Sequence, residues 1–272
     1  MIAGKSKLLI AAVAYVAIAG QALAAQCGDN AAGFPAWLES FRAEAAANGV
    51  SKRTIAEALD GVSYATKTIS LDRNQKSFKL TFDQFMQKRG ASAIVSKGRT
   101  LKKQNEALFR KIEAKYGVPA GPLLAIWGME TGFGSFQGNQ DAFAALATLA
   151  YDCRRSEFFE EQLYAALQIL QTGQLKRSQM KGAGHGEIGQ MQFLPANYVK
   201  FGTDGDGNGK VDMITSRADA LASTANYLRG YGWQPGQGYQ EGEPNFAAIQ
   251  GWNKAGVYQK AIAAIGLAID GG

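Results

Sequence analysis

The sequence predicts a mainly α-helical protein. Along most of the 272-residue chain, apolar residues recur at helical spacing, as Trp37, Phe41 and Ala45 do at i, i+4 and i+8. Glycines follow several of these stripes where a helix would end. Candidate strands are short and few, at 188–193 and near Val211. We therefore expect a helical fold with only small β elements.

The expected helices can be followed in chain order by their apolar faces and their ends. The first ends at Gly49, and Ser51 is the expected N-cap of the second, whose inner face carries Ile55, Ala58 and Leu59. The later stripes are Leu108–Ile112–Tyr116 before Gly117, Phe159–Leu163–Ala166–Leu170 before Gly173, Leu221–Ala225–Leu228 before Gly230, and Tyr258–Ala261–Ile262–Ile265.

Residues 77–83 fit two structures. Apolar and polar residues alternate there, as in a strand, but the same residues also fit the start of a helix that continues through Phe85 and Met86. The pattern leaves both alternatives open.

The first 24 residues have the pattern of a secretory signal peptide. Two lysines precede an apolar run at 8–19, which is too short to span a bilayer, and a small-residue cleavage pattern ends at Ala24. Cys27 follows closely and raises the question of a lipid anchor, but Gln26 is a poor match to the small residue that lipid attachment normally requires. We expect cleavage after Ala24 and a soluble mature protein without a transmembrane helix; lipid anchoring at Cys27 is the less favoured alternative.

The cysteine count bears on the same question of export. Cys27 and Cys153 are the only cysteines, and an even count in an exported protein suggests a disulfide. Two separate thiols are the alternative, because the sequence does not show whether they meet.

The net charge and the residue composition exclude several classes of function. The net charge of +6 becomes +4 once the two signal-peptide lysines are removed, which suits an anionic partner such as cell-wall polymer, a membrane surface or nucleic acid. Export and the lack of an arginine-rich run argue against nucleic acid. His185 is the single histidine, so histidine-rich zinc sites are excluded, and no phosphate-binding glycine loop is present.

Glu130 is the strongest candidate for a catalytic acid in this sequence. It follows a run, 123–129, that is apolar except for Gly128, and a helix that is apolar all round is normally buried. Trp127 lies three residues earlier and is expected on the same face, where an aromatic wall and poor hydration would raise the pKa of the carboxyl. The alternative is an exposed or salt-bridged glutamate at a frayed helix end.

An acidic, glycine-rich loop predicts a structural cation site. From Asp204 onward, oxygen side chains fall at the first, third, fifth and ninth positions of an EF-hand pattern and Gly209 falls at the sixth. Thr215 replaces the usual glutamate at the twelfth position, and Asp219 is the nearest replacement acid. We predict calcium, with the ligands Asp204, Asp206, Asn208, Lys210 through its carbonyl, Asp212 and Asp219; a metal-free turn is the alternative.

Aromatic and amide residues crowd the last third of the chain. Flat rings and amide hydrogen bonders suit sugars, which have apolar faces and hydroxyl edges, although most of these rings individually fit ordinary core packing. The cluster includes Gln190, Gln192, Asn197, Tyr198, Asn226, Tyr227, Tyr231, Trp233, Trp252, Asn253 and Tyr258.

Together these motifs resemble the lytic murein transglycosylase B family, a group of exported bacterial glycosidases with a lysozyme-like fold. The resemblance covers nearly the whole mature chain. The resemblance rests on the segments Tyr116–Pro119, Ile126–Thr131, Ala145–Asp152, Gly189–Pro195, the loop from Asp204, Ala218–Ala222, Ala225–Leu228, and Trp252–Asn253 with Tyr258.

The resemblance implies a periplasmic enzyme that cleaves the β-1,4 bond between N-acetylmuramic acid and N-acetylglucosamine without water and leaves a 1,6-anhydro end. Glu130 matches the family's catalytic acid. A water-using muramidase and a non-catalytic peptidoglycan-binding protein are the alternatives. The positions that match glycan-binding residues are Gln192, Tyr227, Trp252, Asn253, Tyr258 and Phe85.

The resemblance also implies an organisation and partners. We predict a signal peptide at 1–24, an N-terminal helical region at 25–116 and a lysozyme-like catalytic core at 117–272 that includes the EF-hand-like loop 204–219. Peptidoglycan glycan strands are the expected partner, other cell-wall enzymes are candidate partners, no organic cofactor is needed, and a monomer is expected.

Four positions depart from the family pattern. Phe85 stands where a tyrosine is expected, and Ala183 replaces a hydroxyl residue. His185 and Glu187 are unexpected, and Glu187 offers a second carboxylate of the kind a hydrolase uses.

Overall fold

The computed structural model describes residues 26–74 and 80–271, and this part of the chain is mainly helical, which confirms the predicted fold class. The signal peptide predicted at 1–24 lies outside the described residues. The helices are α1 (Phe34–Ala47), α2 (Lys52–Leu59), α3 (Thr66–Arg73), α4 (Phe82–Arg89), α5 (Ala91–Gln104), α6 (Glu106–Tyr116), α7 (Ala120–Thr131), α8 (Ala142–Tyr151), α9 (Ser156–Gln171), α10 (Pro195–Phe201), α11 (Arg217–Gly230), α12 (Phe246–Trp252) and α13 (Gly256–Asp270).

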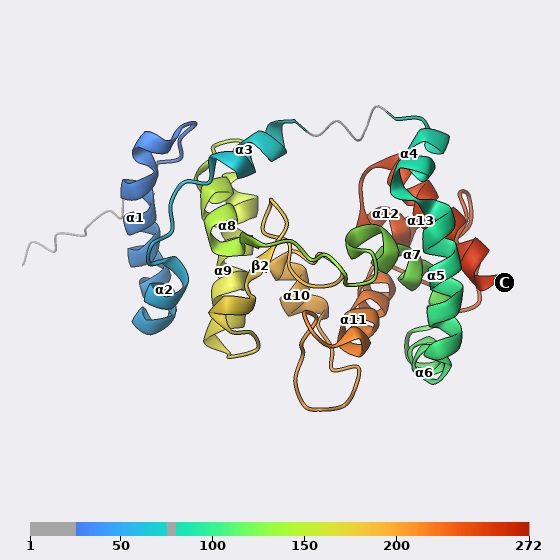
Figure 1. The fold of residues 1–272 in the computed structure, drawn as a ribbon. Helices are drawn as coiled ribbons and strands as arrows, with labels where there is room; N and C mark the ends of the chain where they lie inside the picture. The colour runs from blue at the N-terminus through green and yellow to red at the C-terminus, as the bar shows by residue number, and fades with distance from the viewer. Residues whose placement is uncertain (1–25, 75–79, 272) are drawn as a thin grey trace, which may run out of the picture.

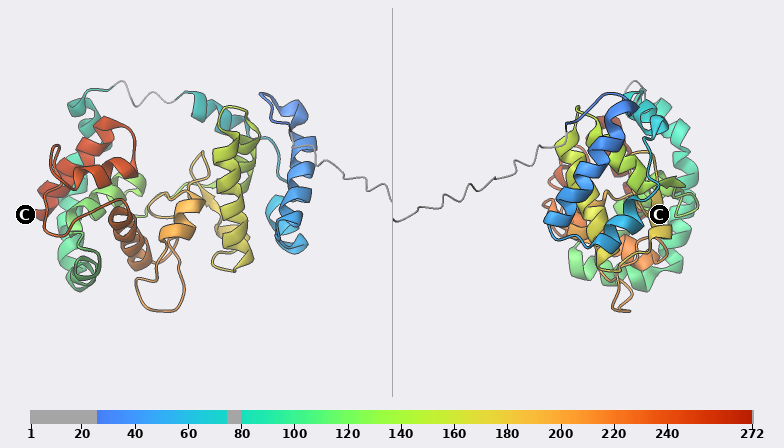
Figure 2. Two further views of the ribbon diagram at one scale, coloured as in Figure 1. Left: turned by 180° about the vertical axis from the view of Figure 1, so that it is seen from behind. Right: turned by 90° about the vertical axis from the view of Figure 1, so that its left-hand side faces the viewer.

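The helices form an elongated row. α1 and α2 stand at one end, α8 and α9 come next, α10 and α11 lie in the middle, and α7, α13 and α5 make the other end (Figures 1 and 2). Short 3-10 turns lie at Ala31–Gly33 and Arg177–Gln179. The one sheet among the described residues pairs β1 (Gln140–Asp141) antiparallel with β2 (Lys181–Gly182).

Helix α7 is the central element of one half. Its residues are buried all round except Glu130, as its unbroken apolar run predicted, and it packs on α5, α11 and α13. Gly121 of α7 and Gly266 of α13 allow the closest approach, because a Cβ on Gly121 would lie 2.3 Å from the Gly266 carbonyl oxygen. The two backbones therefore touch.

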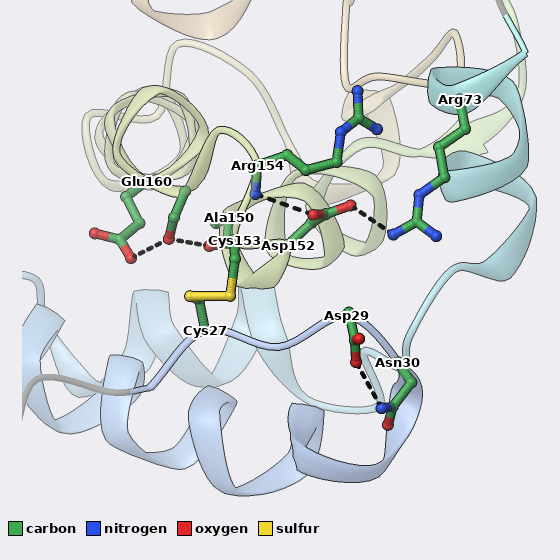
Figure 3. The surroundings of a disulfide bond; sticks show 10 residues. Cys27, Asp29, Asn30, Arg73, Ala150, Asp152, Cys153, Arg154 and Glu160 are labelled. Atoms are coloured by element: carbon green, nitrogen blue, oxygen red, sulfur yellow. Dashed lines mark hydrogen bonds and ion pairs between the residues drawn. A yellow bond between two sulfur atoms is a disulfide. The ribbon is translucent and has the colours of Figure 1, made fainter.

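Helices α8 and α9 form the core of the other half, with α1, α2 and α3 packed against them. Cys27 and Cys153 are joined in a disulfide that ties the segment before α1 to the loop after α8 (Figure 3). Beside it, the Asp152 carboxylate accepts a hydrogen bond from Arg73 at 3.3 Å and one from the Arg154 amide at 3.1 Å. The disulfide alternative of the sequence analysis is thus the one the structure has.

Several helix ends follow the predicted capping residues. The Ser51 side chain accepts the Thr54 amide at the start of α2, and Gly49 adopts a positive φ of 87° after α1. Gly117 and Gly173 likewise have positive φ after α6 and α9. These ends depend on local chemistry, so the sequence reveals them.

The two strand predictions are wrong. Residues 188–193 form a tight turn in which Ile188 and Phe193 exchange backbone hydrogen bonds of 2.9 and 3.0 Å. Ile188 also forms an isolated bridge with Gly182 of β2, but no strand runs through 188–193. Val211 lies in a loop, where its carbonyl accepts the Tyr198 hydroxyl. Of residues 77–83, the last two are the first residues of α4, which Thr81 caps, so the helical alternative is correct there. Residues 77–79 lie outside the described residues.

The predicted boundary at residue 117 stays a prediction. Helices on its two sides pack together, because α5 contacts α7 and α13 and α6 contacts α11. Among the described helices, none combines the length and apolar character needed to cross a membrane.

We predict that Cys153→Ser lowers the free energy of unfolding by about 2–4 kcal/mol, since the disulfide closes a long loop, with a sequence separation of 126 between its cysteines. Urea unfolding of the oxidised protein measures it. Cys27→Ser and the double variant serve as controls and should lose the same amount. A reduced wild-type protein as stable as the oxidised one would contradict the prediction.

Candidate active site

The Glu130 carboxyl lies at the C-terminal end of α7, where Gly132 with a φ of 58° ends the helix. Tyr258 of α13 donates its hydroxyl to Glu130 Oε1 at 2.6 Å, and Trp252 of α12 donates its indole Nε1 to the same oxygen at 3.0 Å. Two donors on Oε1 favour the proton of a neutral acid on Oε2. The second oxygen is thus the one suited to proton transfer.

Burial raises the pKa of the Glu130 carboxyl above its ordinary value, and the negative charge of Glu187 adds to the rise. The hydrogen bonds from Tyr258 and Trp252 and the positive charge of Arg89 act in the opposite direction without cancelling it. This confirms the predicted rise, and a raised pKa is what a general acid needs near neutral pH.

The aromatic residues that touch this carboxyl are different from the predicted one. Trp127 lines a separate cavity and packs edge-on against Phe133, with 5.5 Å between ring centroids. Three residues along a helix turn the side chain by roughly 300°, so Trp127 and Glu130 diverge by roughly 60°. Trp252 and Tyr258, from helices far along the chain, supply the aromatic environment.

A cavity of about 330 Å³ opens at Glu130. Four of the six predicted glycan-binding residues line it, namely Gln192, Tyr227, Trp252 and Asn253. Tyr258 is buried behind Glu130, and Phe85 packs edge-on behind Tyr258 with ring centroids 5.8 Å apart. Phe85 therefore supports Tyr258 from the core, and the structure does not bring it to the cavity wall.

Each cavity residue is held by its own contacts. Gln192 has a positive φ of 51°, and its Nε2 donates to the Gly189 and Gln137 carbonyls. Such strain in a residue other than glycine is common at functional sites. Tyr227 donates its hydroxyl to the Gly251 carbonyl at 2.7 Å, and the Asn253 side chain caps the start of the next turn at Ala255.

Other residues of the aromatic and amide cluster are structural. Asn226 donates to the Phe201 carbonyl, Tyr198 to that of Val211, and Trp233 to that of Gly117. Gln190 donates to the Ile214 carbonyl. For these residues the core-packing alternative is the one the structure has.

Glu187 also lines the cavity and forms a charged pair with His185. The His185 Nδ1 lies 3.4 Å from Glu187 Oε1, and the His185 amide donates to Oε2 at 3.0 Å. On the far side, the His185 Nε2 lies 3.6 Å from Asp72, which itself pairs with Arg154 and Arg155.

His185 and Glu187 shift each other's pKa in opposite directions. The hydrogen bond to Glu187 raises the pKa of His185. Burial alone would raise the pKa of Glu187, but the hydrogen bond and charge of His185 outweigh it and lower that pKa. The two carboxyls of the cavity thus have pKa values shifted in opposite directions, that of Glu130 upward and that of Glu187 downward.

Sequence reasoning missed Arg89. Its Nη1 donates to the Met129 carbonyl at 3.4 Å, and its guanidinium lies 5.3 Å from the centroid of Phe85 and 5.6 Å from that of Tyr258. The i, i+4 spacing of Phe85 and Arg89 on α4 was the available signal.

Away from this cavity, three carboxylates of the acidic loop converge. One oxygen each of Asp204, Asp206 and Asp219 lies within 4.8 Å of the others. Backbone amides hold them, for Asp219 accepts the amides of Gly205, Asp206 and Asp212. Oxygen ligands in such an arrangement fit a hard cation.

The remaining predicted ligands make local contacts. Asp212 accepts the amides of Ile214 and Thr215, and the Asn208 side chain accepts the Lys210 amide. Hydrogen bonds from backbone amides, chiefly that of Gly209, lower the pKa of Asp204, so this carboxylate stays anionic.

Comparison with known proteins matches this geometry to a family. A family model described as "Transglycosylase SLT domain" matches residues 33–242. The chain therefore belongs to the SLT-domain transglycosylases. Within that class, it is a member of the lytic murein transglycosylase B family that the sequence resembled.

Three relatives show the extent of the similarity. Membrane-bound lytic murein transglycosylase B of Escherichia coli (strain K12) is 34% identical over 122 residues, which are 44% of this chain and only 34% of that relative. SltB3 from Pseudomonas aeruginosa, solved in complex with NAG-anhNAM-pentapeptide, is 30% identical with a TM-score of 0.81, covering 88% of this chain and 80% of SltB3. Slt35 from Escherichia coli, solved in complex with calcium, shares the fold at 22% identity and a TM-score of 0.77, covering 90% of this chain and 96% of that one.

We predict opposite shifts of the Glu130 pKa in two variants. Tyr258→Phe removes a donor that stabilises the carboxylate, so the pKa should rise. Glu187→Gln removes a neighbouring negative charge, so it should fall. Carbon-13 NMR titration of glutamate-labelled protein measures both, with Glu130→Gln identifying the resonance.

Glu241→Gln is the matched control, because Glu241 pairs with Lys260 on the surface and should leave the Glu130 titration unchanged. Shifts in the same direction for Tyr258→Phe and Glu187→Gln would contradict the electrostatic account.

Proposed function

We propose that this protein is a peptidoglycan lytic transglycosylase that cleaves between N-acetylmuramic acid and N-acetylglucosamine. The observation that carries the proposal is the Glu130 carboxyl, which has a raised pKa and two donors on one oxygen, in a cavity lined by rings and amides. The family and the sugar-peptide ligand of SltB3 support peptidoglycan as the substrate class.

The proposed reaction uses Glu130 twice. As an acid it gives its proton to the glycosidic oxygen while the bond from that oxygen to C1 of the muramoyl residue breaks. As a carboxylate it then takes the proton of the muramoyl 6-hydroxyl while that oxygen bonds to C1. Glu130 ends protonated as it began, no water is consumed, and the products are a free 4-hydroxyl and a 1,6-anhydro end.

The surrounding residues support both roles. Tyr258 and Trp252 stabilise the carboxylate that forms when the proton leaves, and Arg89 adds a positive charge nearby. Burial raises the pKa of Tyr258 well above its ordinary value, so its hydroxyl stays a donor throughout. The anionic Glu187 favours the positive charge that develops on the sugar ring as the bond breaks.

The muramidase alternative requires a base that activates water. Glu187 is the second carboxylate of the cavity, and His185 contacts both of its oxygens. These contacts favour Glu187 as a fixed negative charge over Glu187 as a base that accepts a proton from water. They therefore favour the transglycosylase reaction.

We predict that Glu130→Gln lowers turnover of purified peptidoglycan by at least about a hundredfold, the loss of a general acid, while the melting temperature stays close to that of the wild type. Mass spectrometry of the wild-type products should show ends one water lighter than hydrolysed ends. Glu241→Gln is the control and should retain activity. Products of hydrolysed mass would support the muramidase instead, and substantial activity in Glu130→Gln would reject Glu130 as the acid.

We propose that the acidic loop binds calcium as a structural ion. Converging oxygens of Asp204, Asp206 and Asp219 and the EF-hand spacing support this, as does the calcium complex of Slt35. The ion would offset the repulsion of three nearby carboxylates. The roles of Asn208, Lys210 and Asp212 as further ligands stay predictions.

We predict that calcium raises the melting temperature of the wild type and that a chelator reverses the rise, because the ion binds only the folded loop. Asp206→Asn, an exposed position, should lose this response. Asp83→Asn on α4 should keep it. A wild-type melting temperature that calcium and chelator leave unchanged would mean that the loop folds without the ion.

We further propose that the protein works in the periplasm without a lipid on Cys27. The disulfide supports an oxidising compartment. It also occupies the sulfur to which a lipid would be attached, since one sulfur cannot form both bonds. The monomeric state and partnership with other cell-wall enzymes stay predictions.

A further inference from the structure

A second, larger cavity lies beside the one at Glu130. It has a volume of about 840 Å³ and runs between α9 and α10 to the turn after α1. α9 and α10 lie side by side (Figure 1). Leu194 and Asn197, at the start of α10, line both cavities and are half-buried, so the two cavities lie next to each other at this point.

The cavity is long enough for several sugar residues. Phe158 and Gln171 line its ends along α9, and a rise of 1.5 Å per residue places them about 20 Å apart. It is therefore a groove along the helix and extends well beyond a point of contact.

The lining has the chemistry that sugars require. Phe158 and Tyr231 are 43% and 42% exposed, so part of each ring is accessible to a ligand. Amide side chains also line the cavity, namely Asn48, Gln168, Gln171 and Asn197. The charged side chains there, Glu161 and Lys200, have opposite signs, so the groove is close to neutral.

Aromatic contacts connect the groove to the catalytic acid. Trp252, which donates to Glu130, packs edge-on against Tyr227 with centroids 5.0 Å apart. Tyr227 in turn stacks on Tyr231 at 4.4 Å and 19°. One end of this series faces the Glu130 cavity and the other lines the groove.

We propose that the groove between α9 and α10 binds distal N-acetylhexosamine residues of the same glycan strand whose bond is cleaved at Glu130. The inference rests on the proposed function and adds a preference for long strands. Open rings and amides in a near-neutral groove favour sugar rings over stem peptides, which carry carboxylates and ammonium groups. Because Leu194 and Asn197 line both cavities, one strand that passes over them can occupy both.

The test compares strand lengths in a Phe158→Ala variant of the full chain. The substrates are glycan strands freed of peptide, one set of tetrasaccharides and one set of long strands. We expect kcat/KM for long strands to fall about fivefold, the contribution of one ring contact, and that for tetrasaccharides to stay unchanged. Leu267→Ala, which truncates a side chain 53% exposed on α13, is the control and should change neither.

Three outcomes would overturn the inference. An equal loss on both lengths would indicate general damage, and no loss on either would mean that long strands bypass the groove. A loss that appears only with strands bearing stem peptides would make the peptide the occupant. Anhydro products from tetrasaccharides report on the proposed function separately, so its failure is distinguishable from failure of the groove.

Discussion

The structure depends on a carboxyl group kept away from water at the end of an apolar helix. Glu130 is charged only at a cost in free energy, because burial disfavours the anion. Tyr258 and Trp252 reduce that cost without removing it, since both donate to Oε1. The result is a carboxyl that holds its proton more strongly than an exposed glutamate does and has donors in place for the carboxylate it becomes.

This arrangement requires close helix packing. Tyr258 reaches Glu130 because α13 lies against α7 at Gly121 and Gly266, where a side chain would collide with backbone. α4 packs on α13 and brings Phe85 and Arg89 against the Tyr258 ring. The N-terminal helices nearest to α7 therefore belong to the support of the catalytic acid as much as the later ones do.

Glu187, the second carboxyl of the cavity, has the opposite electrostatic environment. His185 holds Glu187 as an anion, and Asp72 with its two arginines holds His185 in place. The pKa of one carboxyl is therefore raised and that of the other lowered within one small cavity. Beyond them, the stacked rings of Tyr227 and Tyr231 lead from the Glu130 cavity to the groove on α9.

The sequence by itself determined the features that depend on neighbouring residues. Helical periodicity and capping residues such as Ser51, Gly117 and Gly173 fix local backbone geometry, and the apolar run before Glu130 predicted the burial of the helix that carries it. Elements without such local signals were harder to predict from the sequence. Helix α8 is buried on all sides and shows no amphipathic stripe. The Ile188–Phe193 turn resembled a strand because a short apolar segment alone does not reveal whether it pairs along its length. Only the tertiary structure decided what surrounds the carboxyl. Trp252 and Tyr258 lie 122 and 128 residues from Glu130, whereas the expected neighbour Trp127 faces another cavity. Periodicity orients a side chain on its own helix, but which helices meet is set by packing across the whole chain.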